Sequence, residues 1–365
     1  MRVLIVGSLC NLDIAFAELL LKNNISATVL RSKVDPSIKL KTLASYPKYF
    51  DLDHFLYAAS PYDFLKALHK SDILISITGA VIGKYGMLWP LAGVLLSKPV
   101  ISVATGSDIA ELAIQDNVAA RVYRKILRRS VRILTPPFTG IIKNLKLLNL
   151  LGHTSYIRYP VFFAGDLNSQ REIGSTQTKL RVLHVANLDW GVVDNGPWRK
   201  WTKRSDIFLK GILEAMALSE NIECKIAYRG PDRDLAKKMI LESGFADRFE
   251  WFNEVDQHDL QKIIASGDLM ADQFDAGALG LTAIEAMGLG TPVLTYLDDQ
   301  FLQNSYSLED FPPVVNLRDS SEIAEFLITA NRKDLWERGG ESREWAIRNH
   351  DLYKADFSNI LRHLA

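Results

Sequence analysis

The chain of 365 residues carries 43 basic and 43 acidic residues, so its net charge is zero and no overall field attracts nucleic acid. Its hydrophobic content of 48% is that of a globular protein, and the length suits two domains of about 150 to 180 residues. No run of about eighteen uncharged apolar residues occurs, so the sequence predicts no transmembrane helix.

Strand and helix signals alternate from the amino terminus onward, which indicates βα units around parallel sheets. The apolar run at 2–6 stops at Gly7 and is soon followed by Asp13, so it is predicted as a first strand and not as a signal peptide. Gly7 is expected to lie in a ligand-binding loop at the mouth of the sheet, although the dinucleotide fingerprint G-x-G-x-x-G is absent. The expected strands of the first half are 2–6, 26–30, 72–77, 100–104 and 131–134, and candidate helices are 12–22, 62–68 and 138–150.

A second series of βα units follows residues 165–179, which are almost free of apolar residues and are predicted to be the interdomain linker. The sequence thus predicts an α/β protein with two Rossmann-like domains, residues 1–164 and 180–345, whose parallel sheets face a central cleft with their carboxyl edges. A last helix is expected over about 341–364. The expected strands of the second half are 180–186, 222–228, 249–252, 269–271 and 293–296.

The segment from Ala271 to Leu294 predicts a nucleotide site. Gly277 and Gly280 bracket a tight turn, and the N–H groups of the helix that follows can bind a diphosphate. A carboxylate at Glu285 lies about 7.5 Å along the helix axis from Gly280, which is about the span from a diphosphate to the ribose hydroxyls. The alternative is a glycine-capped core helix with one exposed glutamate. The residues expected to bind the nucleotide are Gly277, Ala278, Leu279, Gly280, Leu281, Thr282 and Glu285.

From Gly280 onward this segment resembles the retaining GT-B glycosyltransferases of family 4, or glycosyl transferases group 1, whose usual text is E-G-F-G-L-x-x-x-E-A-M-A-x-G-x-P-V. The resemblance implies the GT-B fold, with residues 346–365 returning to the first domain. It also implies sugar transfer from a nucleotide-diphosphate sugar as co-substrate, with retention and without a metal or cofactor. The chain departs from the family at three positions: Gly277 replaces the first glutamate, Asn187 the phosphate arginine and Thr105 the first-domain histidine.

The resemblance also nominates side chains around the donor. Lys203 aligns with the phosphate lysine, and Arg199 or Arg229 can supply the missing arginine charge. Asp275 and Asp108 are the candidates for sugar hydroxyls. For each cation the alternative is a solvated surface position, and for Asp108 it is helix capping.

Three further polar residues are interpreted by their place in the strands. Asn253 lies in a strand-end segment expected to contact the base, and Thr105 lies on the acceptor side of the cleft. His184, within a buried strand, is expected to be a core histidine.

One segment of the first domain carries a strong local charge. Arg121, Lys125, Arg128 and Arg132 follow helical 4-3-4 spacing, with Val122, Ile126 and Ile133 expected on the inward side. Such a helix either contacts anionic lipid peripherally or is a solvated face. Cys10 and Cys224 have no partner at metal-ligand spacing, so a reduced, metal-free, cytoplasmic protein is expected. If the basic helix binds lipid, the protein is expected to be peripheral on the inner face of the membrane.

The function predicted from these observations is a bacterial glycosyltransferase that moves a sugar to a glycan, a lipid-linked acceptor or another hydroxyl, in polysaccharide or glycoconjugate biosynthesis. The main alternative is a catalytically impaired nucleotide-sugar-binding partner subunit, because three family side chains are replaced. A GT-B epimerase or phosphorylase shares the architecture, and the missing fingerprint argues against a dinucleotide oxidoreductase.

Overall fold

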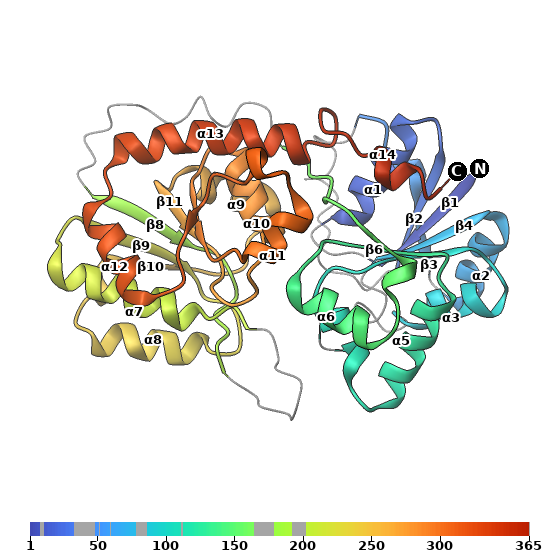
Figure 1. Ribbon diagram of the computed structural model, residues 1–365, viewed down its shortest axis with the longest axis horizontal. Coiled ribbons are helices and arrows are strands. Elements are labelled where there is room, and N and C mark those ends of the chain that lie inside the picture. The colour runs from blue at the N-terminus through green and yellow to red at the C-terminus, as the bar shows by residue number, and fades with distance from the viewer. Residues whose placement is uncertain are drawn as a thin grey trace. The chain divides into compact units, whose positions relative to one another are not determined.

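The computed structural model describes residues 1–7, 11–32, 48–50, 52–58, 60–77, 86–110, 112–163, 179–191 and 202–364. The chain divides into two compact units, Met1–Phe162 with Asn349–Ala365, and Phe163–Arg348. Each unit is a parallel sheet covered by helices on both faces (Figure 1). Of the expected linker 165–179, only Lys179 lies within the described ranges.

The first unit has seven parallel strands in the order β3-β2-β1-β4-β5-β6-β7. Its central strand β1 is buried from Val3 to Val6 because both faces are covered, by α1 and α14 on one side and by α2, α3, α5 and α6 on the other (Figure 1). The strands are β1 Arg2–Val6, β2 Ser26–Ser32, β3 Phe55–Ala58, β4 Ile73–Ile77, β5 Val100–Val103, β6 Arg132–Thr135 and β7 Thr154–Tyr156. The helices are α1 Leu12–Lys22, α2 Pro61–Lys70, α3 Leu88–Leu95, α4 Ser107–Ala110, α5 Val118–Arg129, α6 Thr139–Leu147 and α14 Ser358–Leu361.

The second unit repeats this design with six parallel strands in the order β10-β9-β8-β11-β12-β13. Its main core packs α7, α8 and α12 against one face of the sheet, with Phe208 and Ile212 fully buried. The strands are β8 Leu180–His184, β9 Ile222–Ala227, β10 Phe249–Phe252, β11 Leu269–Ala271, β12 Val293–Thr295 and β13 Val315–Asn316. The helices are α7 Ser205–Leu218, α8 Arg233–Glu242, α9 Gln257–Ala265, α10 Leu281–Gly288, α11 Asp299–Ser305, α12 Ser320–Thr329 and α13 Arg332–His350.

The α/β class and the two Rossmann-like sheets predicted from the sequence are confirmed, whereas three short edge-region strands, β3, β7 and β13, were not predicted. These strands have only two to four residues, too few for a periodic signal. Among the described residues, no helix combines the length and the apolar character needed to cross a bilayer.

The expected last helix over 341–364 is wrong. Helix α13 ends at His350, and the chain becomes helical again only at Ser358. The interruption arises because Asp351 forms a parallel bridge with Val161. Val161 N donates to His350 O at 2.8 Å, and Leu352 N donates to Val161 O at 3.1 Å, so tertiary pairing overrides local helix propensity here.

The expectation for the basic helix needs a second correction. Helix α5 ends at Arg129, so Arg132 and Ile133 belong to strand β6. Val122 is only half-buried, while Tyr123 is 1% exposed and takes the inward position beside Ile126.

Gly7 closes β1 against the end of β4, and a side chain there would collide with the neighbouring strand. Its φ is +80°, and a Cβ would lie 2.1 Å from Ile77 O. We expect Gly7→Ala to destabilise the protein by about 2 to 4 kcal/mol, because left-handed strain and a backbone clash add. Urea unfolding measures the change. The matched control is Gly152→Ala in the same unit, where a Cβ meets nothing within 4 Å and the effect should stay within about 0.5 kcal/mol.

Candidate donor site

The connection from β11 to α10 forms a tight turn at the carboxyl edge of the second sheet. Gly277 has φ +63°, and Gly280 is the N-cap residue of α10 without any side-chain cap. Leu281 and Thr282 are half-buried, whereas Ala278 and Leu279 pack inward. In any helix the first N–H groups have no acceptor within the helix itself. Because Gly280 has no side chain to cap them, the first N–H groups of α10 can bind an anion.

Glu285 lies in the second turn of α10 with 8% of its surface exposed. Burial raises the pKa of this carboxyl to about 7, and a hydrogen bond from Gln257 Nε2 to Glu285 Oε1 at 3.0 Å offsets part of that rise. Gln257 is the first residue of α9. The carboxyl is thus held in place by a neighbouring helix, close to its midpoint of titration at neutral pH.

Lys203 is joined to the turn through the buried side chain of Gln273. Lys203 Nζ donates to Gln273 Oε1 at 2.7 Å, and Gln273 Nε2 donates to the carbonyl of Ala278. The Gln273 carbonyl accepts from Thr295 Oγ1 and from Tyr296 N, both at 2.9 Å. One amide side chain therefore sets the distance between the ammonium group and the glycine turn.

A second buried acid lies behind this turn. Asp272 is 3% exposed, and its Oδ2 lies 2.9 Å from the place that a Cβ on Gly280 would take, so the carboxyl packs directly behind the start of α10. Burial raises the pKa of the Asp272 carboxyl, while the positive charge of Lys203 acts in the opposite direction. A proton on this carboxyl, or the charge of Lys203, removes the repulsion that it would exert on a bound anion.

His184 is the buried support that the sequence predicted. Its Nδ1 lies 3.0 Å from the Ala271 carbonyl, which can only accept, so Nδ1 carries the proton and Nε2 faces Ser205 Oγ at 3.1 Å. Burial lowers the pKa of His184 to about 4. The neutral ring ties β8 and β11 to the start of α7, directly after Lys203.

Steric contact with Asp298 favours glycine at position 277. A Cβ there would lie 2.6 Å from Asp298 Oδ2, and Asp298 N donates to Gly277 O at 3.0 Å. Asp298 is also the N-cap of α11, with Oδ1 accepting from Phe301 N at 2.6 Å. A carboxylate from another helix thus occupies the space beside the turn where a side chain at 277 would begin.

The other residues of this unit that the sequence nominated lie on separate segments of the chain. Arg229 and Asn253 are exposed at the carboxyl ends of β9 and β10, two and three strands from β11, and their roles stay predictions. Arg199 lies outside the described residues. The hydrogen bond from Arg204 to Asp206 is the main cause that raises the pKa of Arg204. The negative charge of Asp275, which is half-buried, adds to this rise.

Sequence reasoning did not single out Arg204, Gln257 or Asp298 for the site. The only signal for them was position: Arg204 follows Lys203, and Asp298 follows the buried strand β12 at the same sheet edge. Their partners are far apart in sequence, so no local pattern could reveal the contacts.

In the first unit, Asp108 is 1% exposed and its oxygens are used internally. They accept from the N–H groups of Thr105, Gly106 and Ile109 at 3.0 to 3.3 Å and from Tyr123 Oη at 3.1 Å. Burial raises the pKa of Asp108 and these donors lower it. These bonds hold the loop in front of α4, and the ligand role of Asp108 stays a prediction, as does that of the half-buried Thr105 at the same edge.

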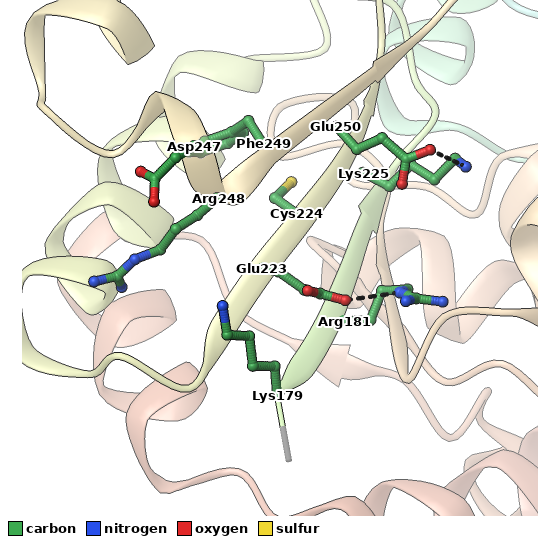
Figure 2. Close-up of a pocket in the computed structure, with 9 residues that line it drawn as sticks. All are labelled: Lys179, Arg181, Glu223, Cys224, Lys225, Asp247, Arg248, Phe249 and Glu250. Carbon is green, nitrogen blue, oxygen red and sulfur yellow. Dashed lines mark hydrogen bonds and ion pairs between the residues drawn. The ribbon is translucent and has the colours of Figure 1, made fainter. Parts of the chain in front are cut away.

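A pocket of the second unit lies at the opposite edge of its sheet (Figure 2). It is lined by charged side chains at the amino ends of β8, β9 and β10, with ion pairs from Arg181 to Glu223 at 2.9 Å and from Lys225 to Glu250 at 2.6 Å. Its volume of about 160 Å³ is below the roughly 300 Å³ at which ligand pockets begin, and it includes none of the nominated residues.

Two Rossmann-like units with parallel sheets are the architecture of GT-B proteins, and comparisons with solved structures agree. HepE from Anabaena, solved with UDP, aligns with a TM-score of 0.66 at 14% identity over 100% of this chain and 99% of its own. Sucrose-phosphate synthase from Thermosynechococcus elongatus aligns at 0.63 and 15% identity over 100% and 99%. A UDP-N-acetylglucosamine 2-epimerase from Listeria monocytogenes, itself described as putative, aligns at 0.55 and 13% identity over 99% and 94%. These likenesses establish the fold.

The class of chemistry comes from the sequence of the second unit. Residues 208–302, which include the turn and α10, match the family model described as Glycosyl transferases group 1. A comparison with curated proteins found no match. The second unit thus carries a glycosyltransferase sequence signature within a chain that has the GT-B fold, and this supports the glycosyltransferase activity that the resemblance of the Ala271–Leu294 segment implied.

The buried carboxyl of Glu285 makes stability depend on pH in a defined direction. Its pKa is about 7 in the folded protein against 4.5 as the reference value, so folding favours the protonated form. The stabilisation is full below pH 4.5 and is lost as the pH rises through 7, a change of about 3 kcal/mol. We expect Glu285→Gln to abolish this loss. Between pH 4.5 and 8, the free energy of unfolding of the variant should therefore rise by about 3 kcal/mol relative to that of the native protein.

Urea unfolding at a series of pH values measures the difference between the two proteins. The neutral His184 acts in the opposite sense between about pH 4 and 6.5, but it is common to both and cancels. Glu242→Gln on the exposed face of α8 is the control and should give a nearly constant difference. A constant difference for Glu285→Gln as well would contradict the raised pKa.

Proposed function

We propose that the enzyme transfers a sugar from a nucleotide-diphosphate donor, with retention and without a metal ion, to a hydroxyl of a glycan or lipid-linked acceptor in bacterial polysaccharide or glycoconjugate biosynthesis. The observation that carries this proposal is the uncapped start of α10 at Gly280, with Lys203 tied to the same turn and Glu285 one turn further along the helix. Similarity to HepE, solved with UDP and with UDP-glucose, supports a nucleotide-sugar donor.

In the proposed complex the diphosphate binds the N–H groups of α10, and Glu285 accepts from the ribose hydroxyls. The bond between the anomeric carbon and the diphosphate oxygen breaks, and a bond to the acceptor oxygen forms on the same face. The acceptor proton passes to the departing diphosphate. Lys203, aided by Arg204, Arg229 or Arg199, neutralises the charge that develops on the leaving group.

A nucleotide titration tests the donor site. We expect one of UDP, GDP or ADP, and not NAD, to raise the unfolding temperature, because a ligand at one hundred times its Kd adds about 2.7 kcal/mol to stability. Glu285→Ala and Lys203→Ala should lose most of this ligand-induced shift, while Lys238→Ala on the exposed face of α8 should keep it. An equal shift in Glu285→Ala and the native protein would remove Glu285 from the site.

The position of Asp298 adds a residue to the proposed sugar subsite. Its carboxylate lies against Gly277, beside the turn that is proposed to hold the diphosphate, and Asp275 has the cation Arg204 nearby. We therefore assign hydroxyl binding to Asp298 in addition to the sequence candidates Asp275 and Asp108.

Asp298→Ser separates this role from helix capping, since serine also caps helices well. We expect the variant to keep its nucleotide-induced stabilisation and to lose roughly tenfold or more in transfer rate, the cost of one hydrogen bond to a charged group. Asp256→Ser, the same exchange at the N-cap of α9, is the control and should retain the rate. Full activity of Asp298→Ser would exclude the assignment.

The alternative is a nucleotide-sugar-binding subunit without activity of its own, which the replacements at Gly277, Asn187 and Thr105 favour. Such a protein would bind a nucleoside diphosphate, as the enzyme does. Release of nucleoside diphosphate from the donor, by transfer or by slow hydrolysis, distinguishes the two, because a binder produces none.

A further inference from the structure

Three helices of the first unit end together at the edge of the sheet opposite to its ligand-binding loops. In a parallel sheet each connecting helix runs back to the amino ends of the strands, and α3 and α5 end just before β5 and β6, while α6 leads to β7. Val131 N donates to Val100 O at 2.7 Å, and Arg132 Nη1 donates to Gly152 O at 3.3 Å. These bonds join the three turns into one surface.

The ends of these helices expose both apolar and basic side chains. Leu95, Leu96 and Leu147 are 65%, 56% and 60% exposed. The cations of this surface are Arg128, Arg129 and Lys146, which are exposed and form no ion pair with any residue in the described ranges. We call these six residues the amino-edge patch.

The surrounding sequence reinforces the charge of the patch. Residues 117–165 contain nine lysines and arginines and no aspartate or glutamate, although the whole chain is neutral. Cations in the last turn of a helix also offset its dipole, which accounts for the basic residues of the patch. It does not account for three leucines that keep more than half of their surface in water.

We propose that the amino-edge patch docks the enzyme on an anionic lipid bilayer. Arginine and lysine near such a surface contribute attraction that a neutral bilayer does not provide, and leucines between them can enter the apolar boundary of the headgroups. Charge complementarity thus selects the lipid, and the leucines distinguish a bilayer from a soluble polyanion. The inference is independent of the donor site, because the patch lies at the amino edge of the first sheet.

Co-sedimentation with vesicles of phosphatidylcholine, with and without 30 mol% phosphatidylglycerol, roughly the content of a strongly anionic membrane, tests the proposal. We expect the full chain to bind the anionic vesicles only, and less at high salt. Arg128→Gln/Arg129→Gln should lower the partition coefficient about 30-fold, at roughly 1 kcal/mol per residue and 1.4 kcal/mol per tenfold. Leu95→Ser/Leu147→Ser should lower it about tenfold or more.

Lys237→Gln/Lys238→Gln on α8 removes the same charge from an exposed helix of the second unit and should leave binding unchanged. Because the exchanged side chains are exposed, each variant should keep its unfolding temperature and its nucleotide-induced shift. Equal binding to neutral vesicles, or none to anionic ones, overturns the proposal. Two further results would overturn the proposal. Binding that is unchanged in the leucine variant and is competed by heparin would indicate a soluble polyanion as the ligand. A native protein that is a dimer and dissociates in the leucine variant would indicate that a second copy covers the patch.

Discussion

The candidate donor site depends on one steric constraint, the path of the backbone between β11 and α10. Gly277 adopts φ +63° in this turn, and a Cβ there would lie 2.6 Å from Asp298 Oδ2, so both the backbone conformation and the neighbouring carboxylate favour glycine. Gln273 then ties the turn to Lys203, and His184 ties the start of α7 to β8 and β11. Hydrogen bonds thus join the turn before α10, the Lys203 ammonium group and the start of α7, and Gln257 holds the Glu285 carboxyl from α9.

Electrostatics at this turn combine a positive helix end with buried acids. Burial raises the pKa values of Asp272 and Glu285, so that both side chains bind protons more readily than exposed carboxyls do. This reduces the negative charge that a diphosphate would otherwise meet, and it leaves Glu285 able to exchange protons near neutral pH. Beside the turn, the Asp298 carboxylate lies where a Cβ on Gly277 would begin, so the acidic group nearest to Gly277 comes from the N-cap of α11.

The first unit uses the two edges of its sheet differently. At the carboxyl edge, Gly7 packs against Ile77 and Asp108 organises the loop that carries Thr105 through bonds to backbone N–H groups. At the amino edge, the ends of three helices expose cations and leucines that keep more than half of their surface in water. Parallel topology itself produces this division. All strands end at the carboxyl edge of the sheet, and the helices that connect them end at its amino edge.

The sequence by itself determined the fold class, both sheets and the glycine turn before α10, because buried apolar runs, glycine punctuation and the helix after Gly280 are local signals. It also determined the place of α1 and of several strands, such as 2–6 and 249–252. Only the tertiary structure decided the end of α13, where Val161 pairs with Asp351, and the partners of Lys203 and Glu285. Those contacts join residues 28 to 190 positions apart, and no periodicity along the chain records which distant side chains meet.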